Sequence, residues 1–155
     1  MKIPFSLTIL ALSSFILADA CDRIKLYWRK GYRWQGSSKE KHWCMEASGD
    51  KIEIEKCRSG SSRQKFKFIS GNRIQSCRDE KKCFEMKGSS VELEKCNSSR
   101  SQEFKKKGSS RKFKLEPKSK SGCLTQRHHP KSGEKVYADS CGRAKKDDTV
   151  YWRKD

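Results

Sequence analysis

Residues 44–57 read Cys-Met-Glu-Ala-Ser-Gly-Asp-Lys-Ile-Glu-Ile-Glu-Lys-Cys, and residues 83–96 repeat them as Cys-Phe-Glu-Met-Lys-Gly-Ser-Ser-Val-Glu-Leu-Glu-Lys-Cys. Seven of the fourteen positions are identical, and each copy is followed by Gln-x-Phe, beginning at Gln64 and Gln102. A looser third copy begins at Cys123 and ends at Cys141. Three units of about forty residues in one small chain predict an architecture built by threefold repetition.

The pattern within each copy indicates β-strands. Ile52 and Ile54 alternate with Glu53 and Glu55, as expected of a strand with one buried face, and no stretch has a convincing helical period. We expect twelve strands, at about 24–29, 42–47, 51–57, 64–69, 73–77, 82–87, 90–96, 102–106, 112–116, 122–126, 135–141 and 150–154. The aromatic residues expected to point inward from the last strand of each unit are Phe66, Phe104 and Tyr151. Twelve strands in three units favour a closed, all-β fold that exposes few strand edges.

The segment 1–20 has the features of a secretory signal peptide. Lys2 gives a positive start, residues 3–17 are mostly apolar, and Ala18 and Ala20 are small residues suited to a cleavage site. The apolar run is too short for a membrane span, and no later stretch is apolar enough to be one. We therefore expect a secreted, extracellular protein without a membrane span. Residues 21–155 would form a single domain, with units at about 21–70, 71–110 and 111–155.

All eight cysteines lie in this expected mature part. An even number in a small secreted domain predicts disulfide bonds, and the absence of Cys-x-x-Cys argues against a zinc site. Equivalent cysteines should form equivalent bonds, which predicts Cys44–Cys57, Cys83–Cys96 and Cys123–Cys141. Cys21 and Cys77 fall outside the repeat, so they pair with each other or one of them is free.

The full repeat is a cysteine followed by an apolar residue, a Gly-containing turn, an apolar-x-apolar-x-x-Cys strand and Gln-x-aromatic. It resembles the repeat of the ricin B-type β-trefoil lectins over about residues 24–152. The third unit departs from it, because residues 149–151 read Thr-Val-Tyr where Gln-x-aromatic is expected. The resemblance implies a β-trefoil, a disulfide within each unit, a carbohydrate-binding function and a mainly structural role for Gln-x-aromatic.

In similar proteins the sugar is held by an Asp after the first cysteine, an aromatic residue before the second and an Asn before the Gln. The residues at the three kinds of position are Glu46, Glu85 and Thr125; Glu55, Glu94 and Asp139; and Arg63, Ser101 and Asp148. Glu46 and Glu85 could still accept bonds from sugar hydroxyls, but no aromatic platform accompanies them. The resemblance therefore implies a lectin whose galactose-type positions are degraded.

Basic residues dominate the chain, whose net charge is +18, and they gather between its second and third units. The candidate ligand-binding members of this cluster are Lys105, Lys106, Lys107, Arg111, Lys112 and Lys114. Lys112 and Lys114 share one face of the expected strand, and Phe113 and Leu115 share the other. Such a surface attracts polyanions, and the charge exceeds what solubility requires.

Three further features of the sequence bear on function. Tyr32 and Trp34 are candidate surface aromatics for a sugar or polyanion, although packing of a long loop would also explain them. Asn97 begins an Asn-Ser-Ser glycosylation sequon. No nucleophile or metal-ligand constellation is present, and His128 and His129 are explained by loop solvation. We expect no catalytic activity, no cofactor and no bound metal.

These observations lead to two hypotheses. The first is a monomeric, secreted lectin-like module that binds carbohydrate, preferentially an acidic or sulfated polysaccharide, through its basic surface. The second is a β-trefoil that binds an extracellular protein, such as a protease inhibitor or secreted effector, and has lost sugar binding. Nucleic-acid or anionic-membrane binding would follow from charge alone and is the weaker expectation for a secreted protein.

Overall fold

The computed structural model describes residues 20–26, 43–126, 131–142 and 151–155. The expected signal peptide, Tyr32 and Trp34 lie outside the described residues, apart from Ala20 at the end of the signal segment. The described elements are β1 (Asp22–Leu26), β2 (Trp43–Ser48), β3 (Lys51–Lys56), η1 (Ser62–Gln64), β4 (Lys65–Ile69), β5 (Arg73–Ser76), β6 (Lys82–Lys87), β7 (Ser90–Lys95), η2 (Arg100–Gln102), β8 (Phe104–Ser109), β9 (Lys112–Pro117), β10 (Cys123–Thr125), β11 (Glu134–Lys135), β12 (Tyr137–Asp139) and β13 (Trp152–Lys154). Both η elements are single 3-10 turns, so the described fold is all-β as predicted.

Six of the strands form a barrel. They follow one another in the order β5-β4-β1-β13-β9-β8, and each strand in this order pairs antiparallel with the next. The backbone N–H of Phe104 at the start of β8 donates to the carbonyl of Asn72, 2.7 Å away, beside β5. This bond joins the two ends of the strand order, so the barrel is closed and has no free sheet edge.

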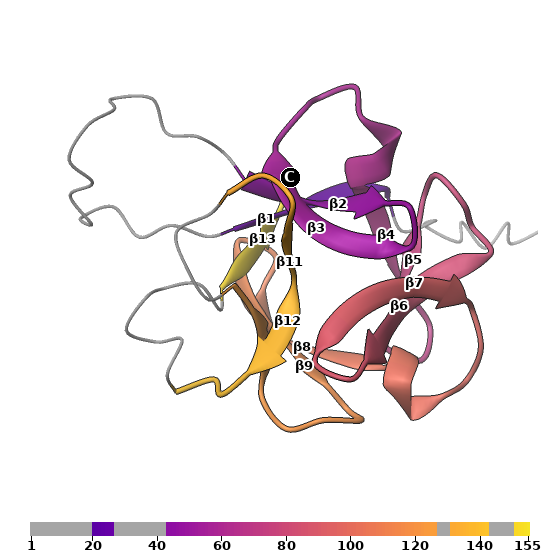
Figure 1. The fold of residues 1–155 in the computed structure, drawn as a ribbon, viewed down its shortest axis with the longest axis vertical. Coiled ribbons are helices and arrows are strands. Elements are labelled where there is room, and N and C mark those ends of the chain that lie inside the picture. Colours follow the sequence, from indigo (N-terminus) through magenta and orange to yellow (C-terminus); the bar gives the residue numbers. More distant parts are fainter. Residues whose placement is uncertain (1–19, 27–42, 127–130, 143–150) are drawn as a thin grey trace, which may run out of the picture.

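Three hairpins pack beside the barrel and contact one another (Figure 1). They are β2–β3, β6–β7 and the shorter pair β10–β12. Val136 connects all three, because its N–H donates to Ile52 O and its carbonyl accepts from Val91 N, each at 3.0 Å. Val136 therefore changes partner in mid-strand, which divides the expected strand 135–141 into β11 and β12 and gives thirteen described strands.

One hydrophobic cluster fills the space between the barrel and the hairpins. Phe66, Phe84 and Phe104 meet edge to face within it, with ring centroids 4.9 and 6.2 Å apart. The expectation for Tyr151 is wrong: the neighbouring Trp152 is fully buried, and its indole N–H donates to Leu124 O at 3.0 Å. Because successive strand residues face opposite sides, this one-residue offset places Tyr151 against the Cys123–Cys141 disulfide instead.

The cysteines form four disulfide bonds. Cys44–Cys57, Cys83–Cys96 and Cys123–Cys141 are the pairs that the repeat predicts. The two remaining cysteines pair with each other, so Cys21–Cys77 joins the segment before β1 to the end of β5. Within the described part of the chain, no helix has the length and apolar character needed to cross a bilayer.

Candidate functional site

The Gln that follows each long repeat is a structural residue. Gln64 is fully buried, and its Nε2 donates to the carboxylate of Glu46 at 2.7 Å and to Lys56 O at 2.9 Å. Its Oε1 accepts the backbone N–H of Arg58 at 2.8 Å. One side chain thus connects β2, the end of β3 and the turn after Cys57. This accounts for the structural role that the resemblance implies for the Gln of the repeat.

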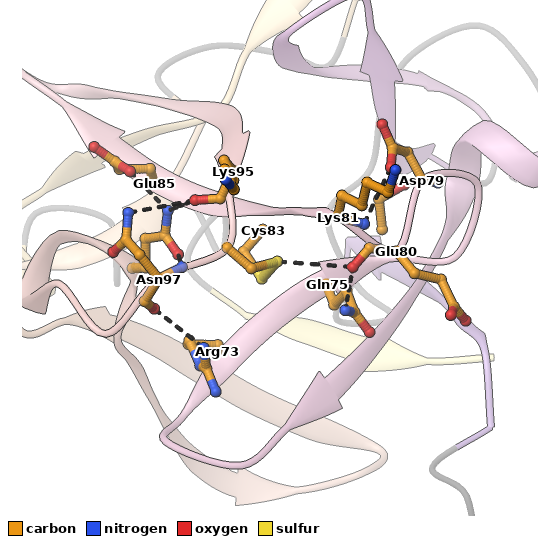
Figure 2. The surroundings of a disulfide bond; sticks show 12 residues. Arg73, Gln75, Asp79, Glu80, Lys81, Cys83, Glu85, Lys95 and Asn97 are labelled. Atoms are coloured by element: carbon orange, nitrogen blue, oxygen red, sulfur yellow. Dashed lines mark hydrogen bonds between the residues drawn. A yellow bond between two sulfur atoms is a disulfide. The ribbon is translucent and has the colours of Figure 1, made fainter.

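The second unit repeats this arrangement bond for bond. Gln102 Nε2 donates to Glu85 at 2.7 Å and to Lys95 O at 2.9 Å, and Oε1 accepts Asn97 N–H at 2.8 Å. Figure 2 shows Glu85, Lys95 and Asn97 gathered beside the Cys83–Cys96 disulfide. Arg58 and Asn97 therefore hold equivalent places, each directly after the second cysteine of its unit.

Glu46, a candidate sugar acceptor, is already bound by the protein's own donors. It is 3% exposed, and both of its oxygens accept from Arg58 Nη2, at 2.8 and 2.6 Å. Arg63 Nη2 lies 3.3 Å from Glu46 Oε1, and the buried Gln64 donates a hydrogen bond to Glu46 Oε2. The hydrogen bond that Arg58 donates to the Glu46 carboxylate raises the pKa of Arg58. A neutral sugar would have to displace these charged donors before it could use this carboxylate.

Glu85, the equivalent residue of the second unit, is occupied in a different way. Lys87 Nζ lies 3.1 Å from its Oε1 and also 3.4 Å from Glu94. Burial would raise the pKa of Glu85, but the hydrogen bonds from Gln102 and Lys87 outweigh it and lower the pKa below its usual value. In the third unit Thr125 is buried and supplies no carboxylate.

Asn97 presents its sequon at an exposed turn. Its side-chain Oδ1 accepts the Ser99 N–H at 2.7 Å, and Arg73 Nη1 donates to its backbone carbonyl at 3.1 Å (Figure 2). The side chain is therefore hydrogen-bonded to neighbouring backbone groups while it remains exposed at the surface.

The basic cluster divides between two faces of the β8–β9 hairpin. We call the outward residues Lys105, Lys107, Lys112 and Lys114 the lysine face. Lys107 stands directly opposite Lys114, although like charges in such pairs are unfavourable. The charge of Lys107 is partly balanced by Glu116, whose Oε2 lies 2.7 Å from Lys107 Nζ. The Nζ atoms of Lys112 and Lys114 lie 4.1 and 5.1 Å from the ring centroid of Tyr151.

Two of the predicted cluster residues lie elsewhere. Lys106 lies opposite the buried Leu115 on the inward face, with its Nζ 5.0 Å from the centroid of Phe113. Arg111 is exposed in the turn between the strands, at the end of the lysine face. Strand alternation separates Lys106 from its sequence neighbours.

The charges are also segregated between the two parts of the fold, which sequence analysis missed. The six barrel strands carry twelve Lys and Arg residues and two acidic residues, a net charge of +10. The described strands of the hairpins, with β11, carry six basic and eight acidic residues, a net charge of −2. The sequence does carry this pattern, because the last strand of each unit (β4, β8 and β13) holds two or three basic residues and no acidic one. Recognising it required the strands to be assigned to the barrel or to the hairpins.

Comparisons with known proteins agree with this architecture. Residues 16–104 match the family described as ricin-type beta-trefoil lectin domain. The β-trefoil lectin of the Vibrio vulnificus hemolysin/cytolysin, solved with N-acetyl-D-lactosamine bound, is 15% identical with a TM-score of 0.63, covering 88% of this chain and 94% of that one. A designed threefold-symmetric protein, ThreeFoil, is 12% identical with a TM-score of 0.61, covering 86% and 96%.

A non-toxic homologue of type II RIPs from Momordica charantia, solved with alpha-methyl-D-galactoside, is 13% identical with a TM-score of 0.68. That alignment covers 88% of this chain but 48% of the bitter gourd chain, so the present protein spans about half of it. No curated protein sequence matches this chain. The matched family covers more than half of the sequence, and the structural neighbours confirm the predicted β-trefoil. The chain therefore belongs to the family of ricin-type β-trefoil lectin domains.

Proposed function

We propose that this protein is a lectin that binds acidic or sulfated glycans, and that the lysine face is its main contact surface. The observation that carries the proposal is the grouping of Lys105, Lys107, Lys112 and Lys114 on one outward face of a barrel whose strands have a net charge of +10. Charges so arranged attract a polyanion over distances of about 10 Å at moderate ionic strength.

The family's own positions support an acidic ligand over a neutral one. Glu46 and Glu85 are occupied by cationic and amide side chains of the same chain. Their stacking counterparts Glu55, Glu94 and Asp139 are not aromatic. The Vibrio and bitter gourd proteins were solved with neutral sugars. Carbohydrate is thus the ligand class that the family favours, and the surface charge favours its acidic members.

Two other features support an extracellular setting. The segment 1–20 has signal-peptide character, and four disulfides are typical of an oxidising compartment, so we propose that the protein is secreted. We propose that Asn97 is glycosylated there if the host is eukaryotic. Intact mass before and after N-glycosidase treatment of protein secreted from eukaryotic cells tests this: an unchanged mass would contradict it.

A glycan array probed at low and high salt tests the main proposal. The wild type should retain sulfated and uronic-acid glycans at low salt and lose them as salt increases. The fourfold variant Lys105→Gln/Lys107→Gln/Lys112→Gln/Lys114→Gln should lose most of this binding.

The matched control replaces four exposed lysines of the hairpins, Lys51, Lys56, Lys95 and Lys135, with Gln. This variant has the same total charge as the lysine-face variant and should bind nearly as well as the wild type. Equal losses in both variants would show that net charge matters and the lysine face does not. Salt-independent binding of neutral sugars would overturn the acidic preference, and no glycan binding at all would favour a protein ligand.

A further inference from the structure

We propose that Arg58 and Arg63 form a second anion site, in the first unit, which takes one carboxylate or sulfate group of an acidic sugar. The site lies in a different part of the molecule from the lysine face and would act on short ligands. The experiments below test it separately from the binding of long acidic chains proposed above.

A buried carboxylate holds the two arginines together. Glu46 is itself fixed by the buried Gln64, whose Nε2 lies 2.7 Å from Oε2. Arg58 Nη2 lies 2.6 Å from Oε2, and Arg63 Nη2 lies 3.3 Å from Oε1. Two guanidinium groups that would otherwise repel each other are thereby kept side by side on one support. A receptor whose groups are already ordered loses less side-chain entropy when its ligand binds.

The outer parts of both guanidinium groups are available to a ligand. The side chains of Arg58 and Arg63 are 53% and 44% exposed, whereas that of Glu46 is 4% exposed. Arg58 binds Glu46 through Nη2, and Arg63 makes its ion pair with Glu46 through Nη2 as well. Within the described part of the chain, Nε and Nη1 of the two arginines make no hydrogen bond to a protein atom. The planar fork of a guanidinium matches the paired oxygens of carboxylate and sulfate.

The local charge favours an anion, with one opposing contribution. Arg58 and Arg63 outnumber Glu46, but Glu55 also lies close enough to contribute to the raised pKa of Arg58. An anion therefore gains directed, charge-assisted bonds here, and a sugar hydroxyl gains only weaker ones. Recognition would depend on the geometry of the fork more than on a large local excess of charge.

The second unit supplies a natural comparison. It holds the same Gln–Glu support, formed by Gln102 and Glu85, but Asn97 and Ser101 stand where the first unit has Arg58 and Arg63. The cation nearest to that support, Lys87, is shared between Glu85 and Glu94. We therefore expect an anion site in the first unit and none in the second.

Binding of small probes tests the site. The probes are a disaccharide with one uronic-acid carboxylate, a disaccharide with one sulfate ester, and a neutral disaccharide, each titrated by NMR. The first two distinguish carboxylate from sulfate recognition. Arg58→Gln/Arg63→Gln should weaken binding of the preferred acidic probe at least about tenfold, the usual effect of removing hydrogen bonds to a charged group. The lysine-face variant should change it less than about twofold.

A gain-of-function variant guards against loss of folding, since removing both arginines leaves Glu46 buried with fewer donors. Asn97→Arg/Ser101→Arg adds two arginines beside Glu85 in the otherwise intact protein, expressed without glycosylation. It should bind a second equivalent of the acidic probe, with new shifts near Glu85. Wild-type affinity in folded Arg58→Gln/Arg63→Gln, or no second equivalent in the gain variant, would overturn the proposal. If Arg58→Gln/Arg63→Gln lost binding of long acidic chains but kept binding of the short probes, the result would count against the lysine face as the main contact surface.

Discussion

Replacing Gln64 with Ala should destabilise the protein strongly without acting directly on ligand binding. The change removes one hydrogen bond to the Glu46 carboxylate, worth about 1.5–3 kcal/mol, and two to backbone groups, worth about 0.5–1.5 kcal/mol each. Gln64 is fully buried, so water cannot replace these bonds unless the site opens. We expect the free energy of unfolding to fall by about 3–5 kcal/mol.

Urea unfolding at neutral pH with the disulfides intact measures this loss, provided the slope of the transition is unchanged. Gln75→Ala is the matched control, because Gln75 is half-buried and its Nε2 donates to a single backbone oxygen, Glu80 O, in the described part of the chain. It should cost no more than about 1 kcal/mol. If Gln64→Ala costs as little as Gln75→Ala while binding of acidic glycans is lost, the structural role given to Gln64 is wrong. Gln102→Ala should behave like Gln64→Ala, since the two networks match.

Three further changes have defined outcomes. Replacing Cys21 and Cys77 with Ala opens a disulfide that spans 56 residues and should lower the free energy of unfolding by about 4 kcal/mol, measured with urea. Gly108→Ala should lower the thermal midpoint far more than Gly49→Ala: both residues have positive φ, but a Cβ on Gly108 would lie 2.4 Å from a backbone oxygen whereas Gly49 faces open space. Because the pKa of Glu85 is lowered by folding, its stabilising effect is present above the ordinary glutamate pKa of about 4.3 and is lost as pH falls further; Glu85→Gln should flatten the decline of the unfolding free energy with acid.

Much of the fold was predictable because the information is local and repeated. Alternation placed Ile52, Ile54, Val91 and Leu93 in the core, and all four are buried. The third unit was harder, since its Gln-x-aromatic is missing and alternation alone allows either of two registers. Tyr151 and Trp152 are adjacent in the sequence, and the folded structure buries Trp152, whose indole N–H donates to Leu124 O, while Tyr151 packs against the Cys123–Cys141 disulfide.

The residues of the candidate site could be identified from the sequence, but the contacts between them could not. The sequence identified Glu46 and Glu85 as family positions and the lysines as a cluster. It did not show that Arg58 covers Glu46, because the two residues come together only when β2 meets the turn after Cys57. It also treated Lys105, Lys106 and Lys107 as one group, whereas pairing with β9 turns Lys106 inward.

By itself the sequence determined a threefold, disulfide-linked β protein, because a repeat of buried and exposed positions survives in the order of residues. It also determined the pairing within each copy, since equivalent cysteines occupy equivalent places. The tertiary structure alone decided how charge is divided between barrel and hairpins, and which charged groups are already bound by the protein itself. Those properties depend on distances between residues far apart in the chain, and closure of the barrel sets these distances.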